Sequence, residues 1–244
     1  SSDGWKTIGE KDYFYIDLDD IKVKQPINIG SDINTENDES NIGVLIDGQT
    51  AYASVYDQLA NNYDVSLFPI PENVYAESVG LVKGRVIVED GNDKGCDIKL
   101  YAKKAKTSVT YSSNVYDGEF VLSLVEKERY LMKIEKEGYE FCASFVDVND
   151  TVESLNFSIS QLVGGESYYL PNIVFDESNT LTEESLEILN EFILYLKSSR
   201  FRIEIFAPGN QAETIAEYII KSGVRKDRIA VSKQSSEKVG YRLQ

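Results

Sequence analysis

The sequence predicts a multidomain chain, mainly β in its first two thirds and α+β in its last third. Up to about residue 160, short segments alternate apolar and polar residues between Gly and Asp-Gly turns, which is typical of strands. Helical periodicity begins only after residue 180. Hydrophobic residues make up 42% of the 244 residues, which is enough for packed cores. We therefore predict three domains, at residues 1–79, 80–162 and 163–244.

Composition excludes several function classes. The formal net charge is −16, and such a surface repels phosphate backbones, so no nucleic-acid partner is expected. The chain has no His, which removes the commonest metal ligand, the commonest general base and every His-dependent catalytic triad. Phosphate-binding loops and dinucleotide motifs are also missing from the sequence. We predict a protein that is not an enzyme and has neither a cofactor nor a metal.

The charge is unevenly distributed along the chain. From Arg200 onward there are nine basic and five acidic residues, whereas the rest holds 16 basic and 36 acidic residues. Two interpretations remain open for the basic end. It is either a solvated face or a surface that meets an acidic partner or a wall polymer.

The cysteines and the apolar runs bear on compartment. Cys96 and Cys142 form no metal-type pair, and they are either one disulfide or two reduced thiols. No apolar run approaches the ~20 residues of a membrane helix, so no transmembrane segment is predicted. No signal peptide is visible and the chain begins at Ser1, so we expect a mature product or a piece of a longer protein.

The first domain is predicted to be β with turns. Residues 41–54 form a hairpin in which Asp47 and Gly48 supply the positive φ angles of a tight turn. Residues 63–68 form a further strand, which Pro69 ends. With segment 33–39, this pattern resembles one blade of a PD-type β-propeller, as in TolB-like proteins. The resemblance implies a truncated propeller or an adapted single blade; the alternative is an ordinary antiparallel meander.

The second domain is predicted to be a small β-sandwich. Strands are expected over residues 80–88, 96–101, 116–124 and 130–141, with turn signals between them. Three motifs follow one another in order: Lys83-Gly84-Arg85-Val86, Asp117-Gly118-Glu119-Phe120 and Glu137-Gly138-Tyr139. Their order and spacing resemble the carboxypeptidase-regulatory-like domain. In that family the domain is non-catalytic, so the resemblance implies no active site here.

The third domain is predicted to be α+β with a βαβαββ order. A strand over residues 171–176 precedes a helix that Thr182 caps. A strand over 202–206 leads into a helix over 211–221, which Gly223 ends. Strands over 229–231 and 241–243 complete the order.

This third domain resembles the peptidoglycan-binding domain of the OmpA family over about 80 residues. The resemblance is carried by Asn172-Ile173-Val174-Phe175-Asp176, Ile203-Glu204-Ile205, residues 212–220 and Asp227-Arg228-Ile229. In the family an Asp and an Arg, separated by a loop, grip the diaminopimelate of the wall peptide. Here Asn210 and Gln211 stand at those positions and the loop is missing. Losing two charge-assisted contacts weakens binding by about two to four decades.

The domain order resembles envelope proteins of bacteria with gliding or type nine secretion machinery. The resemblance implies a place in the periplasm at the outer membrane, in a protein-secretion complex. The leading hypothesis is a non-enzymatic scaffold or adaptor subunit whose OmpA-like domain has lost peptidoglycan binding. The alternative is a peptidoglycan-binding anchor that uses an altered pocket, through Arg202, Arg225 or Arg228.

Overall fold

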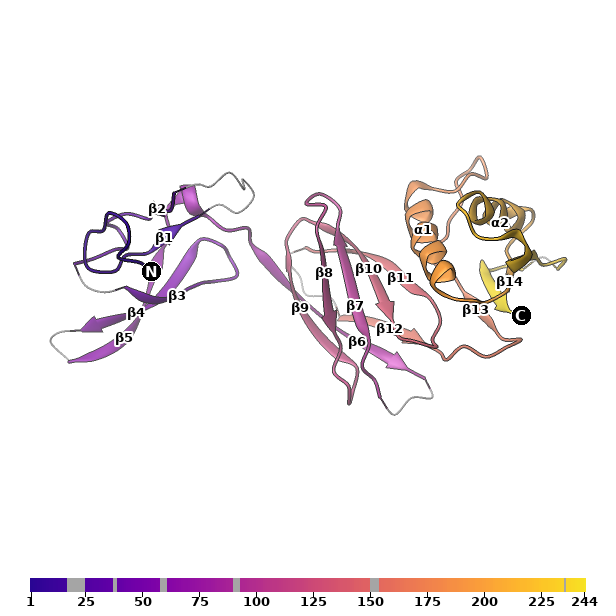
Figure 1. Ribbon diagram of the computed structural model, residues 1–244, viewed down its shortest axis with the longest axis horizontal. Helices are drawn as coiled ribbons and strands as arrows, with labels where there is room; N and C mark the ends of the chain where they lie inside the picture. Colours follow the sequence, from indigo (N-terminus) through magenta and orange to yellow (C-terminus); the bar gives the residue numbers. More distant parts are fainter. Residues whose placement is uncertain (17–24, 37–38, 58–60, 90–92, 150–153, 235) are drawn as a thin grey trace. The chain divides into compact units, whose positions relative to one another are not determined.

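The protein is β-rich, with several small sheets and two α-helices (Figure 1). The structure is a computed structural model that describes residues 1–16, 25–36, 39–57, 61–89, 93–149, 154–234 and 236–244. Contacts divide the chain into two compact units. The first holds Ser1–Gly80 with Ser123–Glu126, and the second holds Leu81–Leu122 with Lys127–Gln244. The prediction of a multidomain β-rich chain is confirmed at this level.

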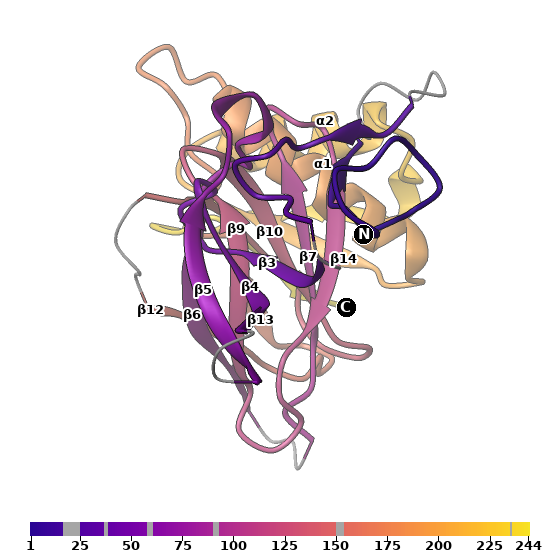
Figure 2. The same ribbon diagram turned by 90° about the vertical axis from the view of Figure 1, so that its left-hand side faces the viewer.

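The first unit contains a three-stranded antiparallel sheet of order β3-β4-β5 (Figures 1 and 2). The predicted hairpin and the strand after it are therefore confirmed. A two-stranded pair, β1-β2, and a 3-10 turn, η1, accompany the sheet. Among the residues that the structure describes in this unit, the buried apolar side chains that pack together are Tyr13, Ile33, Ala51, Ala53 and Ile70. The elements are β1 Phe14–Tyr15, β2 Ile27–Asn28, β3 Ser40–Val44, β4 Thr50–Asp57, β5 Asn62–Pro69 and η1 Glu72–Val74.

The hairpin connection is longer than the sequence predicts. Val44 pairs with Ala51, and residues 45–49 form the loop before β4 begins. Gly48 has φ 70°, whereas Asp47 is not among the residues with positive φ, so the prediction of two positive angles is wrong. The Asp47 carboxylate instead accepts the N–H groups of Gln49 and Thr50 at 2.9 Å each. A side chain thus closes the loop that a second positive φ would otherwise have closed.

The second unit begins with a β-sandwich of two sheets, β11-β10-β7-β8 and β12-β6-β9 (Figure 1). Strict alternation in β6, β7 and β9 buries every second side chain between the sheets. Strands β8, β11 and β12 were not predicted from the sequence. The strands are β6 Val79–Val88, β7 Asp97–Ala102, β8 Ser108–Ser112, β9 Glu119–Val125, β10 Arg129–Glu135, β11 Cys142–Asp147 and β12 Ser154–Ile159.

The rest of the second unit is a four-stranded sheet of order β13-β16-β14-β15 with two helices. β14 and β15 are parallel, and β16 runs antiparallel between β13 and β14. Both predicted helices and the last three predicted strands are present. The elements are β13 Ser167–Tyr169, α1 Glu183–Ser198, β14 Ile203–Phe206, α2 Gln211–Lys221, η2 Lys226–Arg228, β15 Ile229–Val231 and β16 Gly240–Leu243.

The first strand of this sheet lies earlier than predicted. Residues 171–176 form no ladder apart from one bridge, Phe175 to Leu181. A side chain takes the place of a ladder partner for the backbone of Val174. Ser185 Oγ accepts from Val174 N–H at 2.7 Å and donates to Val174 C=O at 2.9 Å. Pro171 has no N–H to contribute to a ladder. The strand is β13, whose Tyr168 lies opposite Tyr241 of β16.

The sandwich and the α+β part share one hydrophobic core. Leu131, Phe141 and Ala143 of the sandwich belong to the cluster that contains the buried face of α1 and the sheet β13-β16-β14-β15. The Phe141 ring lies 5.2 Å from the Phe192 ring of α1, edge to face. Within this unit, α1 therefore packs on the part of the outer face formed by β10 and β11, whereas the outward residues of β7 are exposed.

Candidate functional site

The sequence-predicted ligand positions lie at the start of α2. Asn210 is the residue before the helix and Gln211 is its first residue. The structure links them through a third amide, Asn179, which sequence reasoning did not identify. Asn179 Nδ2 donates to Asn210 Oδ1 at 3.0 Å, and Gln211 Nε2 donates to Asn179 Oδ1 at 3.0 Å. The three side chains form an amide cluster, Asn179-Asn210-Gln211.

Asn179 is held in place by its own loop. Its φ is +58°, a left-handed conformation that Asn tolerates better than most residues. Asp176 Oδ1 accepts the N–H groups of Ser178 and Thr180, each at 2.9 Å, and fixes the turn that presents Asn179. The signal available in the sequence was the Asp176-x-Ser178-Asn179-Thr180 turn pattern, 31 residues before Asn210. Only the fold brings the two together.

The basic candidates lie near the N-terminal end of strand β14, opposite the end at which the amide cluster lies. Arg202 precedes β14 and Arg228 precedes the parallel strand β15, whereas Asn210 follows β14. The structure therefore does not bring the arginines together with the amide cluster. Any ligand that needs an amide and a guanidinium from these sets would have to span the length of the strand.

Two of the three arginines already have partners. Arg228 Nε donates to Phe201 C=O at 2.7 Å and its Nη2 donates to Leu196 C=O at 2.8 Å, so it binds carbonyls at the end of α1. Arg225 makes two bonds to the Asp227 carboxylate, at 3.0 and 2.6 Å. The hydrogen bond from Arg225 lowers the pKa of the Asp227 carboxyl below its ordinary value. Arg202 is exposed and is the remaining basic candidate.

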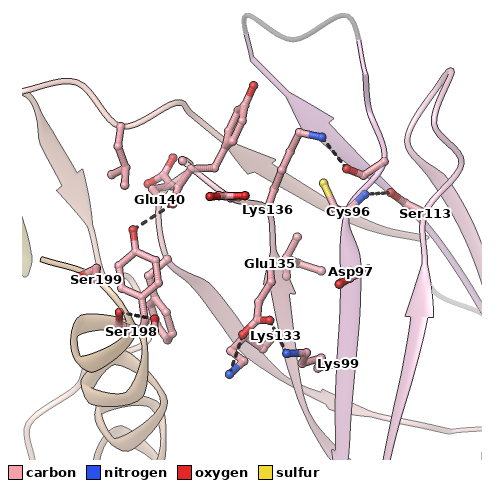
Figure 3. Close-up of a pocket in the computed structure, with 18 of the residues that line it drawn as sticks. Cys96, Asp97, Lys99, Ser113, Lys133, Glu135, Lys136, Glu140, Ser198 and Ser199 are labelled. Atoms are coloured by element: carbon pink, nitrogen blue, oxygen red, sulfur yellow. Dashed lines mark hydrogen bonds and ion pairs between the residues drawn. The ribbon is translucent and has the colours of Figure 1, made fainter. Parts of the chain in front are cut away.

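A cleft of about 920 Å³ lies where the sandwich meets α1 (Figure 3). Across it runs a chain of alternating charges from β7 through β10 to α1. Lys99 Nζ lies 2.5 Å from Glu135, Glu135 lies 2.9 Å from Lys133 Nζ, and Lys133 Nζ lies 2.5 Å from Glu191. Lys136 donates to Gly95 C=O at 2.7 Å. These charges are already neutralised by one another.

The titratable groups of this cleft are poorly suited to catalysis. Burial raises the pKa of the Cys96 thiol, which keeps it in its weakly nucleophilic form. Burial also raises the pKa of Tyr195 in this cleft to about 12, and it raises the pKa of Cys142, which lies outside this cleft, to about 12. Both cysteines are free thiols in the structure, so the disulfide alternative is not realised in it. Within the described residues, no set of three or more Cys, Asp or Glu side chains is placed to hold a metal ion.

Glu140 stands at the junction of the two parts of the second unit. It lines both the cleft of Figure 3 and a second cleft of about 670 Å³. Burial raises the pKa of its carboxyl, opposed by a bond from Ser160 N–H at 2.9 Å. Nearby, Tyr195 Oη donates to Tyr139 C=O at 2.9 Å. The arrangement binds the linking segment to α1 and offers no nucleophile and base pair.

Three ion pairs that were not predicted from the sequence join α1 to the sandwich. Glu184, Glu187 and Glu191 follow one face of α1 at helical spacing. Their partners are Arg129 Nη1 at 2.5 Å, Lys103, and Lys133 Nζ at 2.5 Å. The available signal was this acidic row on a helix, opposite basic residues that alternate with apolar residues on the sandwich strands.

None of the helices in the described ranges is long and apolar enough to cross a membrane. No protein-family model matches the sequence, and no curated protein matches it either. Among solved structures, the chain titled "Crystal Structure of S.CueP" is similar to 47% of this chain, over 76% of its own length, at 9% identity. Its TM-score is 0.27, so this likeness carries no argument about fold family or activity.

Proposed function

We propose that the chain is a non-enzymatic scaffold or adaptor subunit of a periplasmic complex at the outer membrane, in the context of protein secretion. Its third domain is an OmpA-like fold that no longer grips the diaminopimelate of peptidoglycan. The first domain is a propeller-blade-like β segment, and the second is a carboxypeptidase-regulatory-like sandwich. The proposal rests on the resemblances of the sequence together with the contacts described below.

One observation carries the scaffold role: α1 is bound to the sandwich through a shared core and three ion pairs. The core brings Leu131, Phe141 and Ala143 against α1, and the ion pairs flank it. A shared core and directed charge pairs hold two parts of a chain at a fixed geometry. A fixed geometry is what a scaffold needs to hold two partners at a set separation.

The amide cluster supports the loss of wall binding. The carboxylate and guanidinium that would grip a zwitterion are replaced by Asn210 and Gln211, and both amides are bonded to Asn179. Neutral amides cannot form ion pairs with a charged ligand. In addition, the hydrogen bonds of Asn210 and Gln211 to Asn179 would have to break before either amide could bind one. The chemistry of the cleft supports the non-enzymatic role, since burial holds its thiol, Cys96, in the protonated form, and Lys99 and Lys133 are paired with carboxylates.

The test is the size of the assembly that holds the chain in its native envelope. After digestion of the wall and gentle detergent extraction, we expect the chain to migrate in a complex far larger than its own 27.5 kDa. Phe141→Ala removes the ring that packs on α1 and should shift the chain toward smaller species. A wild-type chain that runs as free protein after this extraction would contradict the scaffold role.

A second candidate is a peptidoglycan-binding anchor that uses the basic end of the α+β part. The observation in its favour is that Arg202 and Arg225 are both exposed in a segment of net positive charge. Arg228 is less suited to this role because it binds Leu196 and Phe201 carbonyls. If this candidate is correct, Arg202→Ala with Arg225→Ala abolishes binding to sacculi, whereas Asn210→Ala does not.

A further inference from the structure

Among the described residues, strand β5 lies at the edge of sheet β3-β4-β5 (Figures 1 and 2). The ladder register places the backbone groups of its odd-numbered residues on the side away from β4. Ile70 N–H bonds Gln49 C=O at 2.9 Å, and these residues continue the β4-β5 register by one pair. Hydrogen-bonded pairs alternate along an antiparallel ladder, so the backbone N–H and C=O groups of Phe68 and Ser66 bond to β4. Those of Leu67, which lies between them, point to the other side. Pro69, which has no N–H, fits one of these outward positions.

Two side-chain bonds independently support this assignment. Tyr63 N–H donates to Asn62 Oδ1 at 2.8 Å, and Val65 N–H donates to Asp64 Oδ1 at 2.8 Å. Each of these backbone N–H groups donates to the side chain of the residue that precedes it. The outward edge of β5 is therefore a row of backbone groups at Tyr63, Val65 and Leu67, partly covered by short polar side chains.

The same three residues carry large apolar side chains that lie mostly in solvent. The exposed fractions are 64% for Tyr63, 67% for Val65 and 67% for Leu67. An edge strand with exposed apolar residues is a template for pairing with another strand. A three-stranded sheet such as β3-β4-β5 gains stability when strands are added to it.

The sequence of β5 is self-complementary in the two-fold register centred on Val65. With Val65 on the axis, Val65 lies opposite its counterpart and Tyr63 lies opposite the second copy's Leu67, all at outward positions. With Asp64 on the axis, two carboxylates would be directly opposed, which is destabilising. With Ser66 on the axis, Tyr63 would lie opposite Pro69, which has no N–H to donate.

We propose that β5 is a homodimerisation edge, at which a second copy of this chain pairs antiparallel about a two-fold axis through Val65. The pairing joins two three-stranded sheets into one of six strands. It replaces the exposed side-chain bonds of Asn62 and Asp64 with backbone ladder bonds, and it places apolar side chains against each other across the axis.

Charge gives this interface an unusual salt dependence. Residues 1–80 hold 15 acidic and four basic side chains, so two copies repel one another. The Debye length falls from about 30 Å at 0.01 M salt to about 10 Å at 0.1 M, so salt screens this repulsion. The dimer is therefore expected to strengthen as salt rises. A head-to-tail contact between the acidic unit and the basic C-terminal segment would weaken instead.

The first test is disulfide trapping of the full-length chain. Directly opposed residues of a hydrogen-bonded pair have Cα atoms about 5.5 Å apart, within the range a disulfide spans. Val65→Cys should give a cross-linked dimer at least about ten times faster than Leu67→Cys, because Leu67 lies opposite Tyr63. Equal rates, or faster cross-linking of Leu67→Cys, would overturn the register.

The second test is sedimentation velocity over increasing protein concentration and salt. Val65→Lys opposes two lysines on the axis and should weaken the dimer at least about tenfold. Ile46→Lys makes the same charge change at another exposed apolar residue of this unit and should leave the dimer unchanged. A wild-type monomer at every concentration, a dimer that salt weakens, or equal effects of the two variants would each overturn the proposal. Circular dichroism checks that both variants fold.

Discussion

At the scale of single residues, buried carboxylates in this chain are held by backbone N–H groups. Asp12 is fully buried in the first unit and accepts Ile8 N–H at 2.8 Å, Gly9 N–H at 3.2 Å and Asn28 Nδ2 at 2.5 Å. Burial alone would raise the pKa of Asp12, but these donors lower it below the ordinary value of an aspartate. Glu128 is held in the same way by Lys104, Arg129 and Ala105 N–H groups.

The first prediction concerns the acid stability of the first unit. A depressed folded-state pKa contributes stability that is present above the unfolded value of about 3.9 and is lost as pH falls through the folded value. Asp12→Asn should lower the free energy of unfolding by about 1–3 kcal/mol at pH 7. The difference in free energy of unfolding between Asp12→Asn and the wild type should shrink toward zero as the pH falls below about 4.

Denaturation followed by Trp5 fluorescence would measure this, since Trp5 is the single tryptophan and lies in the same unit. Asp3→Asn is the matched control because Asp3 is exposed. A gap that stays constant down to pH 2.5 would show that the carboxylate of Asp12 is not the group responsible.

A second residue-scale prediction concerns Asn179. Asn179→Ala removes both bonds of the amide cluster, and Asn210 and Gln211 become free to hydrogen-bond water. Both are surface groups, so the free energy of unfolding should fall by no more than about 1 kcal/mol. A loss above about 3 kcal/mol in urea denaturation would indicate that the cluster organises the whole α+β part.

At the scale of elements, most of the regular structure follows from local signals. The α1 and α2 helices, the glycine after α2 and the hairpin β3-β4 all have such signals, and each is present. The strand predicted at residues 171–176 is wrong because Ser185 binds both backbone groups of Val174. That interaction joins residues 11 apart through a side chain, and no alternation of apolar residues reveals it.

The third prediction concerns the ion pairs that α1 makes with β10. Only 15% of the Lys133 side chain is exposed, and it contacts both Glu191 and Glu135. Lys133→Glu places three carboxylates together and should lower the free energy of unfolding of the second unit by about 3–5 kcal/mol. Adding Glu191→Lys should recover part of the loss, because one opposite-charge pair is restored.

A double-mutant cycle in urea measures this coupling. Arg85→Glu is the control, since Arg85 pairs with Glu119 on an exposed part of the sandwich, where ion pairs contribute little. Additive effects of Lys133→Glu and Glu191→Lys would contradict a direct pair between the two residues.

At the scale of the whole molecule, the packing of α1 on the sandwich was not predictable from the sequence. Lys103 and Glu187 are 84 residues apart, and Lys133 and Glu191 are 58 apart. The alternation in the sandwich strands and the periodicity of α1 each predict local structure. Neither pattern predicts that α1 packs on the sandwich. The same limit applies to the candidate site, where Asn210 and Gln211 were identified from the sequence but Asn179 was not.

The fourth prediction tests whether the two parts of the second unit behave as one body. Phe141 packs on Phe192 and Tyr195 of α1, with ring centroids 5.2 and 5.7 Å apart. Phe141→Ala should lower the free energy of unfolding by about 3–5 kcal/mol and increase amide exchange in both α1 and β11. Faster exchange confined to β11, with α1 unchanged, would show that the two parts are independent.

The most direct test of the account is co-sedimentation of the whole chain with purified peptidoglycan sacculi, at low and moderate salt. An intact OmpA-type domain serves as the positive control. We predict that this chain stays in the supernatant at moderate salt while the control pellets, because Asn210 and Gln211 cannot form ion pairs with diaminopimelate. Pelleting of this chain at moderate salt, abolished by Arg202→Ala with Arg225→Ala, would contradict the account and establish a wall anchor.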